Sequence, residues 1–154
     1  MQKHLALTLP ATLLMAATAN AQSMQVSPNG ERRSITGAAA NFTGLVTVTP
    51  LFTSKPESNA GAGQVEFTPG SRSAWHTHPA GQTLIVTSGT GWVQQEGGEK
   101  ITIKPGDVIY TPPGVKHWHG ATTNNSMTHI AITPVVGGKN VDWMELVSDA
   151  EYQR

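Results

Sequence analysis

From residue 41 onward, short runs of alternating apolar and polar residues are each closed by glycine or proline. These runs cover residues 42–52, 64–68, 83–87, 91–95, 101–103, 108–111 and 127–133. Many strands of about five residues, separated by turn residues, are typical of an all-β sandwich or barrel. The pattern therefore predicts an all-β fold with these runs as its strands.

Two segments depart from this strand pattern. Residues 141–152 are the only helical candidate, because Trp143, Leu146 and Val147 follow helical spacing. Residues 22–40 are polar, rich in small side chains and only weakly periodic, which predicts a flexible arm or an edge segment. We therefore expect one domain over 41–154, preceded by an arm and ended by a short helix.

The first 21 residues resemble a secretory signal. A basic start with Lys3 precedes an apolar run over 5–17, and Ala19-Asn20-Ala21 supplies the small side chains of a cleavage site. The apolar run is too short to span a bilayer. A membrane anchor and a disordered tail are the alternatives. We expect a signal peptide over 1–21, cleavage after Ala21, and a periplasmic or secreted protein.

Composition excludes several classes of protein and site. The chain has no cysteine, so disulfides, thiolate ligands and lipoprotein attachment are all excluded. Without Lys3, nine basic residues face ten acidic ones, a formal charge of −1. Nucleic acid and anionic membrane surfaces are therefore not expected partners, since both require a basic patch.

The histidines are clustered. Five of the six lie between residues 76 and 129, at positions 76, 78, 117, 119 and 129. His76-Thr77-His78 and His117-Trp118-His119 are both H-x-H pairs, and alternate side chains of a strand share one face, so each pair can point to one ion. Gln82 follows a turn after the first pair and can add an amide oxygen. One such pair is a weak signal, but two in an all-β chain predict a metal site.

The same residues resemble the two motifs of the cupin family. The first is Gly70-x5-His76-x-His78-x3-Gln82-x6-Gly89, and the second is Gly106-x5-Pro112-x-Gly114-x2-His117. The resemblance implies a double-stranded β-helix, or jelly-roll barrel, with His76, His78, Gln82 and His117 as metal ligands. Two residues depart from the motifs: Gln82 replaces the usual glutamate ligand, and Ala121 replaces the usual asparagine.

A narrower resemblance, from about residue 42 to the C-terminus, is to the manganese-dependent cupin hydroxynitrile lyases. It is carried by residues 74–87, 91–92, 96–98, 116–121, 127–129 and 141–145. This resemblance implies manganese and a catalytic role for His129. The spacing of His129 alone favours a hydrogen-bonded core histidine instead, and that of His119 is equally consistent with a proton-transfer group and a packing residue.

The neutral Gln82 has a chemical consequence of its own. It leaves a divalent ion with its full double charge, which favours Lewis acidity and an anionic ligand but weakens metal retention. Three imidazoles and one oxygen also suit Fe²⁺, Co²⁺, Ni²⁺ and Zn²⁺, so the residues alone do not select the ion. We expect one divalent ion per chain, with Mn²⁺ favoured by the resemblance.

The predicted function is a metal-dependent lyase acting on cyanohydrins, or joining an aldehyde to cyanide, with His129 and His119 as its proton-transfer groups. An Fe²⁺ dioxygenase and a non-catalytic periplasmic binding or sensing protein are the alternatives. A homo-oligomer, dimer or tetramer, is expected because small barrels pair through edge strands. The tryptophans are interpreted as core or rim residues, and Arg72 as a member of a surface ion pair.

Overall fold

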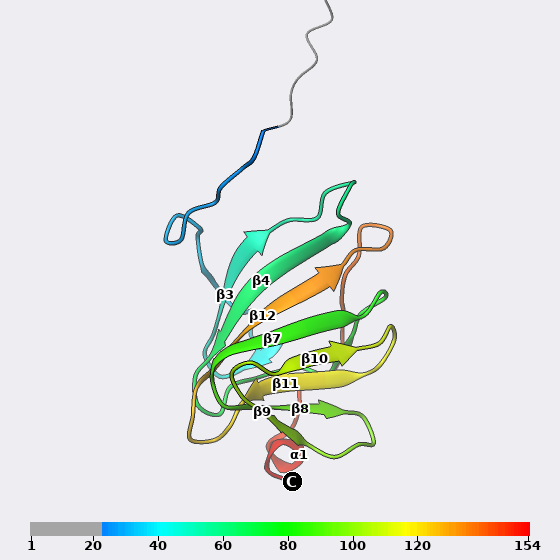
Figure 1. Ribbon diagram of the computed structural model, residues 1–154. Coiled ribbons are helices and arrows are strands. Elements are labelled where there is room, and N and C mark those ends of the chain that lie inside the picture. The colour runs from blue at the N-terminus through cyan, green and yellow to red at the C-terminus, as the bar shows by residue number, and fades with distance from the viewer. Residues whose placement is uncertain (1–22) are drawn as a thin grey trace, which may run out of the picture.

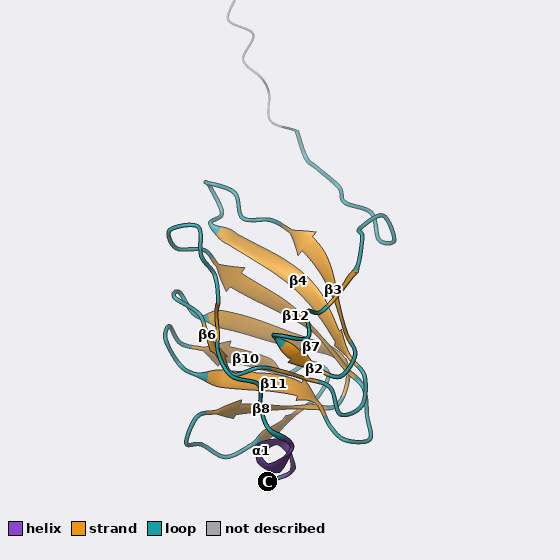
Figure 2. Cartoon of the chain, turned by 180° about the vertical axis from the view of Figure 1, so that it is seen from behind, coloured by secondary structure: helices purple, strands orange, loops and turns teal. Residues whose placement is uncertain are grey.

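The computed structural model describes residues 23–154, so the predicted signal peptide over 1–21 lies outside the described residues. Two curved antiparallel sheets face each other around the interior of a jelly-roll barrel (Figures 1 and 2). This confirms the prediction of an all-β jelly-roll barrel. Within residues 23–154, no helix is long and apolar enough to cross a membrane.

Thirteen strands make up the two sheets. The six-stranded sheet has the order β1 (Ile35–Thr36), β3 (Val46–Phe52), β4 (Ala60–Phe67), β12 (Met127–Pro134), β7 (Gln82–Gly89) and β10 (Val108–Thr111). The second sheet has the order β13 (Asp142–Trp143), β6 (His76–Thr77), β11 (His117–Ala121), β5 (Arg72–Ser73) and β2 (Phe42–Thr43). It also contains β8 (Gly91–Gln95), which pairs with β11 and with β9 (Ile101–Ile103).

The barrel interior follows from alternation along each strand. In β7, Gln82, Leu84 and Val86 are buried, while Thr83 and Ile85 between them are only half-buried. Residues of this inward-facing kind form the main core between the sheets: Val46, Val65, Phe67, Val86, Val93, Ile103, Ala121 and Met127. The core fills one part of the barrel, and the polar inward residues described below occupy another.

The N-terminal arm takes part in the fold. β1 pairs with β3 at the edge of the six-stranded sheet, with Ile35 opposite Val48, so this part of residues 22–40 is an edge segment, the second of the two predicted alternatives. Residues 23–34 contain neither strand nor helix and are almost entirely exposed.

The predicted helix over 141–152 is wrong in extent. The helix α1 covers only Asp149–Gln153, and Ser148 begins it with a capping box to Glu151. The preceding residues are extended, and β13 pairs with β6, where Trp143 lies opposite His76. Pairing to a free sheet edge provides backbone partners that the helical spacing of the side chains did not reveal, and these contacts override the local preference.

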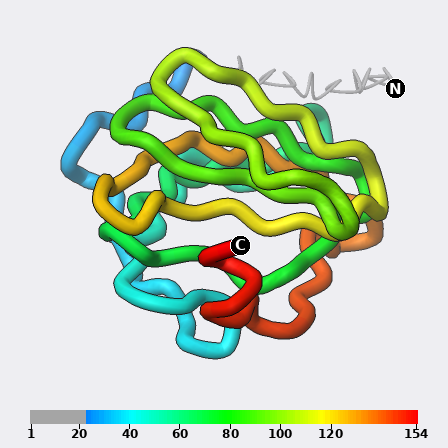
Figure 3. Tube along the Cα trace, turned by 90° about the horizontal axis from the view of Figure 1, so that it is seen from below, coloured from blue at the N-terminus to red at the C-terminus, as the bar shows by residue number. Residues whose placement is uncertain are grey.

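The C-terminal helix lies on the outer side of the second sheet (Figure 3). There it covers a second apolar cluster. Trp75, Trp118, Val147 and Tyr152 form this cluster. The predicted ion pair of Arg72 is present, with Asp149, but the arginine itself is not at the surface, because its side chain is only 5% exposed. Its guanidinium donates to the carbonyl of Val147 and to Asp149, and lies 4.5 Å from the centre of the Tyr152 ring. Arg72 therefore anchors the C-terminal segment to the barrel.

Candidate metal centre and cavity

Strand register brings the histidines together. His76 on β6 lies directly opposite His117 on β11, and His119 follows two residues later on the same strand. His78 lies just beyond the end of β6, in the turn that leads to β7. Gln82 begins β7 in the other sheet, so the group draws on both layers of the barrel. All of these side chains are buried.

Three of the imidazoles are oriented by backbone carbonyl groups. The Nδ1–H of His76 donates to Ala74, that of His78 to Asn140 at 2.5 Å, and that of His117 to Val115. A carbonyl oxygen only accepts hydrogen bonds, so the proton must be on Nδ1 and the lone pair on Nε2. Metal-bound histidines show the same arrangement, in which an outer partner fixes the tautomer and the direction of the ring.

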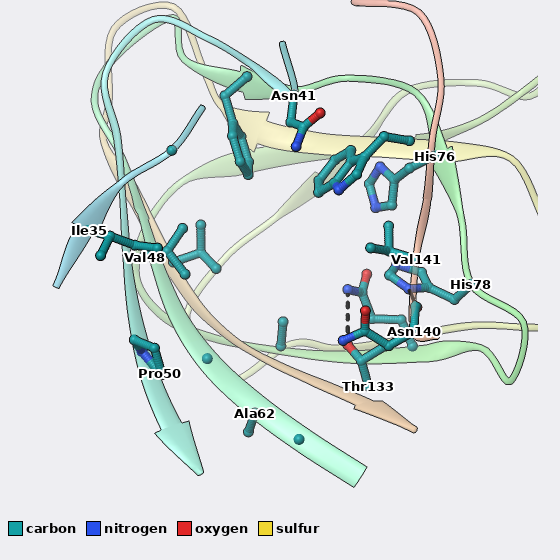
Figure 4. A pocket seen from close by; sticks show the side chains of 18 of the residues that line it. Ile35, Asn41, Val48, Pro50, Ala62, His76, His78, Thr133, Asn140 and Val141 are labelled. Atoms are coloured by element: carbon teal, nitrogen blue, oxygen red, sulfur yellow. Dashed lines mark hydrogen bonds between the residues drawn. The ribbon is translucent and has the colours of Figure 1, made fainter. Parts of the chain in front are cut away.

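The remaining donors fit a divalent ion. The Nε2 atom of His78 is buried without a hydrogen-bond partner, and that of His117 lies 3.3 Å from Oε1 of Gln82. Gln82 is held from behind, because its Nε2 donates to Thr133 Oγ1 at 3.4 Å (Figure 4). The amide oxygen is thus presented to the imidazoles. Three neutral imidazoles and one neutral oxygen are a donor set that first-row divalent ions accept.

His119 and His129 form a hydrogen-bonded pair. Nε2 of His129 lies 3.0 Å from Nδ1 of His119, and the Nε2 atom of His119 is buried without a partner. His119 lines the cavity described below, whereas His129 is absent from its lining and is fully buried on β12. His119 therefore faces the site, and His129 contacts it only through His119.

Burial keeps these imidazoles neutral. Removal from water lowers the pKa of His117 to about 4 and that of His129 to about 3. Burial, together with repulsion from neighbouring imidazoles, lowers the pKa of His76 and of His119 well below the ordinary value. Burial also lowers the pKa of His78, and this effect outweighs the hydrogen bond to the Asn140 carbonyl, which raises it. At neutral pH all five rings hold a lone pair for a metal or a proton.

A cavity of about 580 Å³ opens over this group (Figure 4). His76 and His78 lie along one side, and Val48, Pro50 and Ala62 come from β3 and β4 on the other. Gln82 and His119 also line the cavity. Phe42 and Trp143 add an aromatic corner, in which the two ring centres are 5.4 Å apart. An apolar cavity with a few convergent polar groups is the usual form of a small-molecule site.

The structure thus brings the four predicted metal ligands and His119 together and places His129 behind them. Sequence reasoning missed Thr133, the partner of Gln82, and Asn140, the partner of His78. Asn140 acts through its backbone carbonyl, for which a sequence carries no signal. Trp143 was interpreted only as a core or rim residue, but it packs on His76 with ring centres 4.9 Å apart.

Comparison with known proteins identifies the family. The profile of the family described as "Cupin domain" matches residues 63–133. A curated protein from Granulicella tundricola, (R)-mandelonitrile lyase, is 50% identical over 131 residues, which cover 85% of this chain and 100% of the relative. The chain belongs to the cupin family. The narrower resemblance to the cupin hydroxynitrile lyases is borne out by the match to the mandelonitrile lyase.

Solved structures agree with this assignment. A cupin-like protein from Thermotoga maritima matches this cupin with a TM-score of 0.75 and 39% identity, over 82% of this chain and 96% of that one. A second Thermotoga maritima protein, described as a predicted oxalate decarboxylase, matches with a TM-score of 0.65 and 21% identity, over 73% and 100% of the two chains. At that lower identity, the likeness concerns the fold alone.

Proposed function

We propose that this cupin is a metal-dependent lyase that cleaves the C–C bond of a cyanohydrin to give an aldehyde and hydrogen cyanide. The observation that carries the proposal is the 50% identity to (R)-mandelonitrile lyase over the whole length of that relative. The apolar cavity beside five neutral imidazoles supports it, because an aryl group requires the first feature and proton transfer the second.

His76, His78, Gln82 and His117 would hold the ion, with Mn²⁺ as our proposal for its identity. The ion would supply Lewis acidity toward the hydroxyl oxygen of the substrate. Because all four ligands are uncharged, they would leave its double charge undiminished.

His119 is the residue placed to take the hydroxyl proton. Its Nε2 is free and its ring lines the cavity. When Nε2 accepts a proton, the Nδ1–H of His119 donates to Nε2 of His129 at 3.0 Å and spreads the new charge over two rings. His119 thus acts as the catalytic base and His129 as its positioning partner.

The same pair returns the proton. Once the hydroxyl is deprotonated, the C–C bond breaks, the carbonyl of the aldehyde forms, and the bonding electrons leave with cyanide. Cyanide takes the proton back from the imidazolium of His119 and departs as hydrogen cyanide. The aryl group would rest against the Phe42–Trp143 corner, where an aromatic ring gains contact area and excludes water.

The test is a mandelonitrile-cleavage assay on purified protein whose metal content has been measured. We expect cleavage that is lost on chelation and restored by Mn²⁺. His119→Ala should lower kcat by at least about 100-fold at unchanged metal content, the usual contribution of a general base. The exposed Glu66 on β4 provides a control, since Glu66→Gln should leave kcat unchanged.

Other results would favour a different function. Metal-dependent oxygen consumption without cyanide release would indicate a dioxygenase. Tight binding of an aldehyde by a metal-loaded protein that releases no cyanide would indicate a binding or sensing protein. Either outcome would overturn the lyase proposal while leaving the cupin fold and the metal centre in place.

We also propose that the protein is exported and self-associates. Mass spectrometry of the envelope fraction should find a chain that begins at Gln22. Light scattering on the same material should give the mass of a dimer or tetramer. A chain that retains Met1 and remains in the cytoplasm would contradict export, and a monomeric mass would contradict self-association.

A further inference from the structure

One cluster of three buried imidazoles differs in membership from the proposed ligand set. One ring nitrogen from each of His76, His117 and His119 lies within 4.8 Å of the others, and all three side chains are buried. His76 and His117 belong to the proposed ligand set, but His119 does not. The cluster therefore overlaps the metal centre and extends beyond it on the side of β11.

Each of the three rings has its Nδ1 atom within hydrogen-bond distance of a neighbouring group. His76 and His117 each have Nδ1 engaged by a backbone carbonyl group. In His119, the corresponding Nδ1 faces Nε2 of His129 at 3.0 Å. The lone pairs of His76 and His117 are therefore on Nε2, and that of His119 is on Nε2 in the tautomer whose Nδ1–H donates to His129. The Nε2 of His119 is also buried without a hydrogen-bond partner, and such a group usually has one.

We propose that His76, His117 and His119 form a second position for a divalent ion, which overlaps the first and excludes its simultaneous use. The ions suited to it are those that favour nitrogen ligands in a four-coordinate site, Zn²⁺ above all, with water as the fourth ligand. At Zn–N distances of about 2.0–2.1 Å, two ligand nitrogens of a tetrahedral site are about 3.4 Å apart, so nitrogens that lie up to 4.8 Å apart need to approach one another by up to about 1.4 Å. An ion that prefers oxygen, such as Mn²⁺, stays on the side of His78 and Gln82.

The two metal positions differ in whether Nε2 of His119 remains available to a proton. An ion held by His78 and Gln82 leaves Nε2 of His119 available to a proton. An ion held by His119 occupies that lone pair. If the lyase proposal is correct, the second position is a loaded but inactive form of the enzyme. The existence of the second position does not depend on that activity.

The test measures Zn²⁺ binding by competition with a chromophoric chelator. It compares the wild type, His78→Ala, His119→Ala and the double variant. Each single variant retains one complete position, so each should weaken binding by no more than about tenfold. The double variant loses both positions and should weaken binding by more than about 1,000-fold. This exceeds the product of the single effects, as expected when one ligand substitutes for another.

Two controls separate this result from misfolding. Circular dichroism of each metal-free variant should match the wild type, and where His78→Ala does not fold, His78→Asn replaces it. Mn²⁺ binding, followed by electron paramagnetic resonance, should fall more steeply than Zn²⁺ binding in the His78 variant, because the second position lacks the Gln82 oxygen that Mn²⁺ prefers. Additive single effects, or a loss from His119→Ala as large as that from His117→Ala, would overturn the proposal.

Discussion

Lowering the pH from 7.5 to 5 should destabilise the metal-free protein steeply, because its buried histidines are held neutral. An unfolded chain protonates histidine below the ordinary pKa of 6.5, whereas the folded protein holds the pKa of His117 at about 4 and that of His129 at about 3. Between these values the unfolded state binds more protons than the folded state. Stability therefore falls as the pH falls below 6.5, and the loss continues until the folded-state pKa is reached.

The magnitude follows from the difference between the two states. At pH 5, protonation favours the unfolded state by about 1.36 kcal/mol for each of the roughly 1.5 pH units below 6.5, or about 2 kcal/mol for each histidine. His117 and His129 together should lower the free energy of unfolding by about 4 kcal/mol at pH 5. The lowered pKa values of the other three buried histidines act in the same direction. Since domains are stable by only about 5–15 kcal/mol, the metal-free protein should be close to unfolding at pH 5.

The assay is urea denaturation in the presence of a chelator at pH 7.5, 6 and 5. Between pH 6 and 5, His129→Gln should reduce the slope of unfolding free energy against pH by up to about 1.4 kcal/mol per unit, since one titrating group is removed. Thr133→Val changes a buried residue that does not titrate, and it should shift the curve without changing its slope. Parallel curves for the wild type and His129→Gln would refute the reasoning.

Three substitutions test other parts of the argument. Gln82→Glu should raise metal occupancy but slow cyanohydrin cleavage by about tenfold or more, because a carboxylate binds the ion and repels the departing anion; equal rates at equal metal content would contradict this. Arg72→Ala should lower the free energy of unfolding, measured by urea denaturation, by about 2–4 kcal/mol, because Arg72 donates to the buried carbonyl of Val147. Asp149→Ala should lower it by less than about 1 kcal/mol, because Asp149 is 85% exposed. Gly89→Ala should lower the free energy of unfolding by more than about 3 kcal/mol or prevent soluble expression, because the φ of Gly89 is +74° and a Cβ would lie 1.9 Å from the carbonyl oxygen of Ser126. A variant as stable and soluble as the wild type would contradict this.

The residue pattern of the sequence by itself determined the all-β fold, and the resemblance to the cupin motifs narrowed it from a sandwich or barrel to a barrel. Most of its strands are residue runs that alternate in polarity between glycine and proline turns, and alternation decides which side chains face inward without knowledge of the partner strand. β8, β9 and β10 begin and end where the pattern predicted. The two H-x-H pairs likewise predicted that imidazoles would gather on one side of a sheet. These features depend on residues close together in the chain, so a sequence displays them directly.

Only the tertiary structure decided how the site is held. The Asn140 carbonyl group orients His78 across 62 residues, and Thr133 holds Gln82 across 51. The same is true of the tail, where pairing of β13 with β6 replaced most of the helix expected over 141–152. It is also true of His129, which lies behind His119 because of the register of β12 in the opposite sheet. Each of these outcomes depends on a contact between distant segments, and the local pattern of side chains carries no record of which backbone group will lie beside them.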